Sequence, residues 1–551
     1  MNFTVEVPEK AKIQVSNENR YVYLTTEKHY DPKRKFNVDK RRCIGKLSDD
    51  DKLIPNETYF EMFPDQKHLM PAPDHSDTIK IGLHVLYEHI LDTLDLGAVI
   101  DTVYQENAGI VKDVASYMIT EETSAIQHFE NYGFDHPVFS DHIYSDGRIS
   151  ELMHSMTMAK HDLFLEKWNL LHNETEGIYI SYDSTNMNSA ATGAKLLEYG
   201  YSKDKESPLP QINVSIGIDQ TSLMPMLYEL YPGSIIDNTQ CQHMVNMVHK
   251  FGYQKIGFIL DRGYFSEPNI HYFEDNHYDY IIMAIAGTDF VHPAVEETRL
   301  KLRDCSEYYM ADYGVSGMTA DYRYTINDGK CRLMHVFFNE TRAAHERRII
   351  KEKFAQYDKQ LDMLVQAKTT LKKTANRYSS HYHLKYLGEY LTGYTRNKEK
   401  IDAELQDCGY FVIITSQDMT AEEALKTYRH RDTSEKLFLA DKTFLGADTI
   451  RVHSDESIES KTLINFIALI IRNEIYKQTR VLYNKSKKDF TIPAIIRELD
   501  KIIITRDSKG KYSLRYALTK TQKDILGQFH ITEKSFTKKA GELCEQYSSA
   551  K

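Results

Sequence analysis

The order of strands and helices predicted between residues 177 and 286 constrains the fold of this chain more than any other feature. Three apolar or alternating segments predict strands: GIYISYD, QINVSIGID and PMLYELY. A helix is predicted from Asp237, whose spacing from Gln240 is that of a capping box. The strand KIGFIL, a short helix and the strand DYIIMAI come next. Strands that alternate with helices in this way indicate an α/β domain.

Three strands, a helix, a strand, a helix and a strand resemble the core of ribonuclease-H-like proteins. The resemblance implies that the first and fourth strands lie side by side at the middle of the sheet. In this chain those two strands are predicted to end in Asp183 and Asp261. Asp219 and Asp237 are also acidic and close by, but a strand end accounts for the first and a helix cap for the second.

A second constraining feature is the helix predicted over residues 420 to 442. Thr420 and Glu423 have capping-box spacing, and no Pro or Gly interrupts the run, so about six turns are predicted. Four polar residues follow one another at steps of three, four and seven, and therefore share one stripe: Tyr428, Arg431, Glu435 and Lys442. A carboxylate between cations suits a phosphate chain beside a metal ion. The alternative is an exposed helix face with ordinary salt bridges.

The pattern Y-x2-R-x3-E-x6-K resembles the YREK signature of DDE transposases from bacterial insertion sequences, in the insertion-sequence-four-like branch. The segments YDST, GYSKDKESPLPQINVSIGID, LDRGYFS and YRHRDTSEK extend this resemblance over residues 177–476. It implies cleavage at the ends of a mobile element, followed by attack of the 3′-hydroxyl on target DNA. The implied partners are double-stranded DNA, as terminal inverted repeats and as target, and a second copy of the chain in a synaptic homodimer.

The same resemblance implies a role for each site residue. Asp183, Asp261 and Glu435 would be catalytic metal ligands, and Tyr428, Arg431 and Lys442 would contact the DNA backbone near the cleaved end. Clustered carboxylates repel one another, so divalent cations with oxygen ligands are their natural complement. Two metals about 4 Å apart activate the attacking oxygen and stabilise the leaving one. Mg²⁺ is the expected cofactor, with Mn²⁺ as a substitute.

The expected fold class is α/β, with a ribonuclease-H-like catalytic core interrupted by an insertion of strands and a basic helix. A β-rich N-terminal module, a helical module that is a candidate for reading DNA ends, and a helical basic C-terminal region complete it. The predicted domains are 1–75 (β-rich), 76–175 (helical), 176–286 (core), 287–407 (insertion), 408–478 (core with the signature helix) and 479–551 (basic).

Charge is distributed unevenly along the chain, whose net charge is −11. Residues 342–400 carry 14 Lys and Arg against 6 Asp and Glu, and residues 472–551 carry 18 against 9. Residues 1–341 sum to −22. The asymmetry therefore places the expected non-specific DNA affinity in the two basic segments, which flank the predicted signature helix.

The cellular location expected from the sequence is the bacterial cytoplasm, in association with the nucleoid. Six scattered cysteines without a CxxC pair indicate reduced thiols rather than disulfides or a zinc site. The N-terminus lacks the layout of a signal peptide, and the longest apolar stretch, residues 463–471, is far too short to span a membrane.

Two alternatives to an active transposase remain open. A non-catalytic DNA-binding protein derived from a transposase would be favoured by loss of a carboxylate, and all three are present. A two-metal nuclease without a joining step would share the same fold and ligands.

Overall fold

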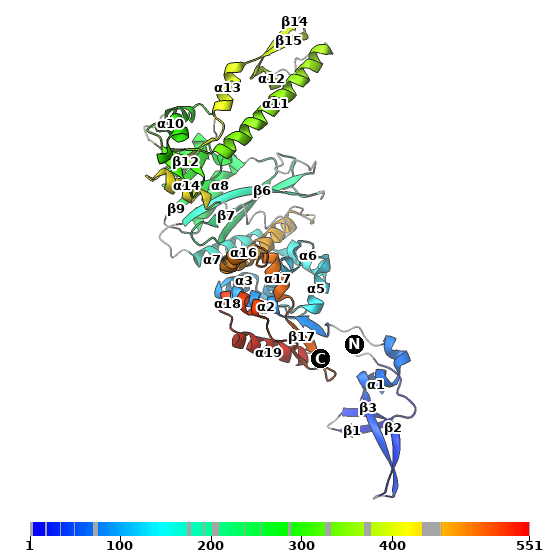
Figure 1. Cartoon of the computed structure of the whole chain (residues 1–551). Helices are drawn as coiled ribbons and strands as arrows, with labels where there is room; N and C mark the ends of the chain where they lie inside the picture. The colour runs from blue at the N-terminus through cyan, green and yellow to red at the C-terminus, as the bar shows by residue number, and fades with distance from the viewer. Residues whose placement is uncertain are drawn as a thin grey trace. The chain divides into compact units, whose positions relative to one another are not determined.

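The computed structural model describes residues 4–16, 19–32, 35–48, 50–69, 75–140, 142–172, 178–189, 191, 193–200, 209–235, 237–253, 255–284, 288–324, 332–367, 376–431, 452 and 454–549. The chain divides into two compact units, Met1–Ser76 and Asp77–Lys551 (Figure 1).

The first unit is an antiparallel sheet in the order β1-β2-β3-β4 with one helix packed on it. Its elements are β1 (Lys12–Ser16), β2 (Asn19–Asp31), β3 (Phe36–Leu47), β4 (Leu53–Pro55), α1 (Glu57–Met62) and a 3-10 turn, η1 (Pro64–Leu69). Alternate strand residues turn toward α1 and form a small core with two residues of that helix: Val22, Leu24, Ile44 and Leu53 from the strands, and Tyr59 and Phe60 from α1.

A nine-stranded sheet is the centre of the second unit, in the order β11-β12-β13-β16-β10-β9-β6-β7-β8. The strands are β6 (Ile178–Asn188), β7 (Gln211–Asp219), β8 (Pro225–Pro232), β9 (Ile256–Leu260), β10 (Asp279–Ala284), β11 (Tyr309–Met310), β12 (Val315–Thr319), β13 (Leu333–Phe338) and β16 (Tyr410–Thr415). Strands β6, β9 and β10 run parallel to one another, and the other neighbouring pairs are antiparallel. The second unit is thus a mixed α/β structure.

Helices cover both faces of this sheet. On one face, α14 (Ala421–Arg429) packs on Ile259, Ile281 and Ile413 through its own apolar residues. On the other face lie α8 (Asp237–Lys250), α9 (Glu267–Asp275) and α10 (His292–Asp304), together with the 3-10 turns η4 (Arg262–Tyr264) and η5 (Ser306–Tyr308).

The segment between β13 and β16 forms a helical excursion with its own small core. It consists of α11 (Glu340–Gln366), α12 (Asn376–Ser379), the hairpin β14 (Tyr382–Leu387) and β15 (Tyr390–Arg396), and α13 (Lys398–Gln406). Its core joins the long helix to the hairpin and α13: Phe354, Leu361, Tyr378, Tyr382, Leu391 and Ile401. In Figure 1, α11 runs beside α13.

The helices between residues 82 and 170 and those of the C-terminal region form one helical body around α16 (Asp455–Lys485). Its other helices are α2 (Gly82–Thr93), α3 (Leu96–Tyr104), α4 (Ala108–Thr120), α5 (Phe129–Asp135), α6 (Asp146–Ser155), α7 (Met158–Leu170), α17 (Ile492–Leu499), α18 (Lys520–Gln528) and α19 (Glu533–Ser549), with the 3-10 turns η2 (Gln105–Asn107) and η3 (Ile126–His128). A three-stranded sheet pairs β5 (Thr78–Lys80) with β17 (Ile503–Arg506) and β18 (Tyr512–Leu514). Among the described residues, no helix is both long and apolar enough to cross a membrane.

A buried histidine joins the early helices to the C-terminal region. His136 is 2% exposed; its Nε2 lies 2.9 Å from Asp500 Oδ1, and its Nδ1 lies 2.6 Å from Asp135 Oδ1. Burial alone lowers the pKa of His136, but the two carboxylates together outweigh burial and raise it to about 9. The imidazolium is therefore the form that the folded protein stabilises.

Because of these two contacts, we expect the free energy of unfolding to fall at alkaline pH. Because the pKa is raised on folding, the contribution of His136 is complete below about pH 6.5 and is lost as the pH rises through about 9. We expect wild-type stability to fall by about 3 kcal/mol more than that of His136→Gln between pH 6.5 and 10. Urea unfolding followed across this range measures the difference, and parallel pH profiles for the two proteins would contradict it.

Candidate active site

Two of the predicted carboxylates lie on neighbouring parallel strands in equal register. β6 pairs with β9 from Ile178↔Ile256 to Tyr182↔Leu260, so Asp183 and Asp261 each follow the last paired residue. Residues in equal register on parallel strands point to the same face, and the strands are about 4.8 Å apart. The sheet therefore brings together two side chains that are 78 residues apart in sequence.

The face that carries these carboxylates is the one covered by α14. Tyr179 and Ile259 pack with α14, and Asp183 and Asp261 lie four and two residues farther along the same strands. The intervening Tyr182 points to the other face, where its hydroxyl donates to Glu229 Oε2 at 2.8 Å. Burial raises the pKa of Tyr182, so the phenol stays a hydrogen-bond donor.

Strand β6 does not end at Asp183, as the sequence predicts, but continues to Asn188. Its polar second half pairs with β7, and Asn186 donates a hydrogen bond to Asn213 within that pair. These buried polar residues have the composition of a loop, and their cross-strand partners keep them in the sheet. Asp183 thus lies within a strand, and its carboxylate accepts a hydrogen bond from the amide of Ser184 at 2.9 Å.

Asp261 follows β9 directly, as predicted, and begins the turn η4. Its Oδ1 accepts the amide of Arg262 at 2.7 Å, and the side chain is 37% exposed. The turn fixes the Asp261 carboxylate through one hydrogen bond, and the exposed part of the carboxylate can still bind a ligand.

Helix α14 brings two further predicted residues to Asp261. The Tyr428 hydroxyl lies 3.4 Å from Asp261 Oδ1, and Arg431 Nη1 lies 3.6 Å from the same oxygen. The Arg431 guanidinium also lies 5.4 Å from the centre of the Tyr428 ring, and both side chains are more than 90% buried. A buried guanidinium beside the carboxylate offsets part of the cost of holding that negative charge there.

The capping box at the start of this helix is present as predicted, because the Thr420 and Glu423 side chains each bond the other's backbone amide. The helix itself is shorter than predicted. It ends at Arg429, and His430 and Arg431 form a turn in which the Arg431 amide bonds to the Tyr428 carbonyl. Glu435 and Lys442 lie outside the described residues.

A family model for the transposase DDE domain matches residues 176–471, which is more than half of the chain. The chain belongs to this transposase family. Among solved structures, the cryo-EM structure of a piggyBac transposase synaptic complex with hairpin DNA is similar, at 9% identity and a TM-score of 0.31. That likeness covers 64% of this chain and 58% of the other. No curated protein matches the chain.

The transposase has a cavity of about 970 Å³, and its lining includes the residue that follows Asp261. Arg262 lines it, as does Met283, whose sulfur lies 3.8 Å from the Tyr428 hydroxyl. The excursion contributes two more cations, Arg342 from α11 and Lys400 from α13. In the sequence, Arg262 is explained by a turn after Asp261. For Arg342 and Lys400, the positive charge of residues 342–400 was the available signal, and it does not distinguish a cavity wall from a solvated helix.

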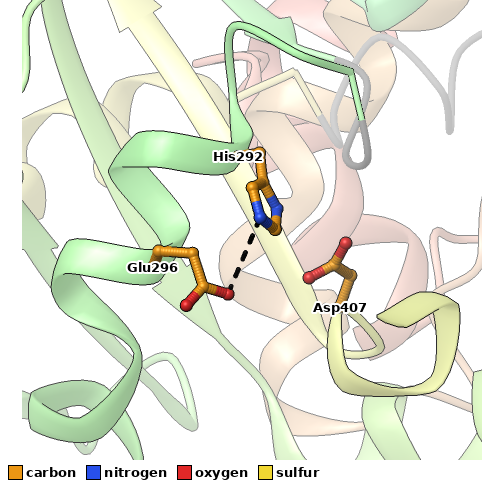
Figure 2. A group of neighbouring side chains, drawn as sticks. All are labelled: His292, Glu296 and Asp407. Carbon is orange, nitrogen blue, oxygen red and sulfur yellow. Dashed lines mark ion pairs between the residues drawn. The ribbon is translucent and has the colours of Figure 1, made fainter. Parts of the chain in front are cut away.

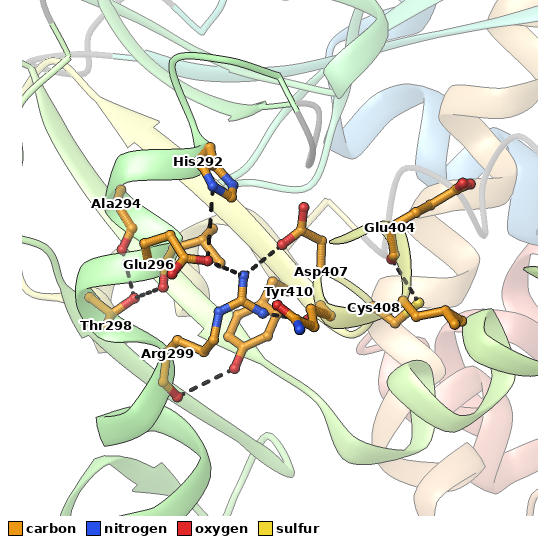
Figure 3. Close-up of polar contacts among 12 residues, drawn as sticks. His292, Ala294, Glu296, Thr298, Arg299, Glu404, Asp407, Cys408 and Tyr410 are labelled. Carbon is orange, nitrogen blue, oxygen red and sulfur yellow. Dashed lines mark hydrogen bonds and ion pairs between the residues drawn. The ribbon is translucent and has the colours of Figure 1, made fainter. Parts of the chain in front are cut away.

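A second polar cluster lies at the junction of α10 and the end of α13. The nearest ligand atoms of His292, Glu296 and Asp407 lie within 4.8 Å of one another, which is a spacing that metal sites also show (Figure 2). Arg299 explains why the two acids of this cluster lie close together without a metal ion. Its guanidinium lies 2.6 Å from Glu296 and 2.7 Å from Asp407 (Figure 3).

The same guanidinium donates to the carbonyl of Gln406 at 2.6 Å and lies over the ring of Tyr410 at 5.3 Å. With one cation already bound to both carboxylates, the cluster is an ion-pair network that fastens α10 to the returning end of the excursion. Its sequence signals are only a His-x3-Glu spacing on α10 and a distant Asp, which is why sequence analysis missed it.

Proposed function

We propose that the chain is a DNA transposase that cleaves the ends of a mobile element and joins the freed 3′ ends to target DNA. The observation that carries the proposal is the equal register of Asp183 and Asp261 on β6 and β9, beneath the helix that begins the signature. The strand order β8-β7-β6-β9-β10 supports a ribonuclease-H-like core. The proposed mobile element is a bacterial insertion sequence of the insertion-sequence-four-like branch, whose transposases carry the YREK signature.

The proposed metal ligands are Asp183, Asp261 and Glu435. Carboxylate oxygens are the donors that Mg²⁺ prefers, and the partly open Asp261 leaves room for water and phosphate to complete the coordination. When bound, two such ions supply activation of the attacking oxygen and stabilisation of the leaving oxygen. The protein's part is to hold the carboxylates in register through β6 and β9, and to fix Asp261 through Tyr428 and Arg431.

The proposed DNA contacts near the scissile phosphate are Tyr428, Arg431 and Lys442. Arg431 already lies beside the carboxylate edge, so its planar donor pair suits a phosphate oxygen there. The neighbouring cavity adds no net positive charge, because the cations Arg262, Arg342 and Lys400 share its lining with Asp289, Glu346, Glu404 and Asp407. The other proposals are the predictions made from the sequence. They are the six domains, double-stranded end and target DNA as partners, a homodimer in the synaptic complex, and a cytoplasmic location.

The function is tested with labelled duplexes carrying the DNA that flanks the gene, a target plasmid and Mg²⁺. We expect nicking at the element boundary and transfer of the label to the plasmid. Nicking without transfer would favour the two-metal nuclease. Binding without nicking, in Mg²⁺ and in Mn²⁺, would favour a non-catalytic DNA-binding protein.

Strand joining should be more sensitive to substitution of Arg431 than to substitution of a nearby cation on α14. Arg431→Ala is expected to lower strand joining roughly 10- to 100-fold, the loss of one or more charge-assisted hydrogen bonds. Arg431→Lys should recover only part of it, because an ammonium cannot bind a phosphate bidentately. The matched control is Lys426→Ala, at an exposed position of α14. Equal joining by Arg431→Ala and wild type would remove Arg431 from the site.

A further inference from the structure

The sheet of the first unit has one covered face and one open face. Val22, Leu24 and Ile44 turn toward α1 and are buried. Strand alternation and cross-strand pairing place Tyr21, Tyr23 and their partners on the opposite side, which we call the basic face. Lys46 lies over the Tyr21 ring at 5.3 Å, on that same side.

Beyond the small core, β2 and β3 continue as a two-stranded ribbon, residues 25–42. Its cross-strand pairs include Thr25↔Arg41, Lys28↔Asp39 and Tyr30↔Asn37. Both residues of each of these pairs lie on the basic face. None of the described ribbon residues is buried, and Tyr30 is 59% exposed. A hairpin without cover on either face is only marginally stable in water, so a ribbon of this kind gains stability from a partner.

Positive charge collects on the basic face. It carries Lys12, Lys28, Arg41 and Lys46 against one acid, Asp39, which lies 2.9 Å from Lys12 and 3.4 Å from Arg41. In sequence, Lys33, Arg34 and Lys35 follow between β2 and β3.

On the α1 side of the same ribbon, the cations have acidic partners. Lys40 lies 3.3 Å from Glu27, and Arg42 lies 2.6 Å from Glu61. The surplus of charge is therefore one-sided, and the total of −22 for residues 1–341 conceals it.

We propose that the basic face binds double-stranded DNA, with the ribbon in the major groove. A major groove about 12 Å wide admits a two-stranded ribbon, whose strands lie about 4.8 Å apart. Lys28 and Arg41 then reach phosphates, while the cross-strand pair Tyr30 and Asn37 faces base edges, where an amide side chain can bind adenine. This interface lies outside the carboxylate site, and it rests on the proposed function only in taking DNA as the ligand.

The test measures binding of the full chain to a fluorescent duplex of random sequence, about 30 base pairs long, in EDTA at several salt concentrations. Lys28→Gln/Arg41→Gln removes two charges from the basic face, and Lys40→Gln/Arg42→Gln removes two from the α1 side of the same strands. We expect the first variant to bind roughly tenfold more weakly near 0.1 M salt, with a salt slope lower by about 1.8, or 0.9 per lost phosphate contact. The second should stay within about twofold of wild type.

Equal losses for the two variants, or no loss in either, would overturn the proposal, as would preference for the single strand of the same sequence. A photo-crosslinking residue at position 30 gives a readout that does not depend on charge. It should capture duplex DNA, whereas the same residue at position 29, on the other side of the ribbon, should not; the reverse pattern would also overturn the proposal. Since EDTA removes the metal, failure here leaves the carboxylate assignment untouched. Loss of cleavage in a carboxylate variant likewise leaves this binding intact.

Discussion

Asp183→Asn and Asp261→Asn are each expected to abolish nicking and joining of end DNA while leaving DNA binding nearly unchanged. Each substitution removes a charged metal ligand and preserves the shape of the side chain. Loss of an outer-shell partner of a metal site already costs about 10- to 100-fold, so loss of a ligand should cost more than roughly 100-fold. Glu435→Gln should behave in the same way. Single-turnover nicking in Mg²⁺ and gel-shift binding in EDTA measure the two properties.

Asp219→Asn is the matched control, because Asp219 is an acid of the same sheet with a purely local role. Its Oδ1 accepts the Thr221 amide at 3.2 Å and its Oδ2 accepts the Ser222 amide at 2.7 Å, and the single oxygen of an asparagine can still accept one of these two bonds. A near wild-type nicking rate in any of the three ligand variants would exclude that residue from the metal site.

Arg332→Met should lower the free energy of unfolding by about 3–5 kcal/mol, which is the cost of leaving one charge of a buried pair unmatched. The Arg332 guanidinium contacts Glu274 through Nε at 2.7 Å and Nη2 at 2.8 Å, and only 2% of the Arg332 side chain is exposed. Tyr280 also donates to this carboxylate, at 2.8 Å. Thermal and urea unfolding of the full chain measure the loss.

The double variant Arg332→Met/Glu274→Leu separates the unmatched charge from the lost packing. It should recover much of the stability, because no charge is then left in the apolar surroundings. If Arg332→Met is as stable as wild type, or if the double variant is less stable than Arg332→Met, the Arg332–Glu274 ion pair does not stabilise the fold.

Much of the core was predictable because its strands are continuous apolar runs. The strands around Phe258 and Ile281 are such runs, and both were found. QINVSIGID coincides with β7 and was found by its alternating Ile and Val residues, although all nine of its residues are buried. Local apolarity is enough where a strand is covered on both faces. The segment DYRYTI, residues 321–326, also has the alternation of an antiparallel strand, but that prediction was wrong over its described residues, since Tyr324 makes only an isolated bridge with Arg332.

Other elements needed information that local sequence does not hold. Helix α10, strand β12 and the β14–β15 hairpin fell in a stretch without regular periodicity. Their apolar residues are sparse, so neither a helical nor a strand period stands out. For the candidate site, the order of elements located Asp183 and Asp261, but the contacts of Tyr428 and Arg431 with Asp261 depend on how α14 crosses the sheet.

The closure of the excursion between β13 and β16 has a consequence for engineering and for evolution. Phe338 and Tyr410 are cross-strand partners, and the Asn339 amide bonds the Gly409 carbonyl at 3.0 Å. The chain thus leaves and rejoins the sheet at one antiparallel pair, so the excursion takes the place of the turn in a β-hairpin. Grafting a different excursion onto these two anchors, or trimming it to a short turn, would leave the strand register beneath α14 in place. The excursion can therefore be exchanged while the strands that carry Asp183 and Asp261 are inherited unchanged.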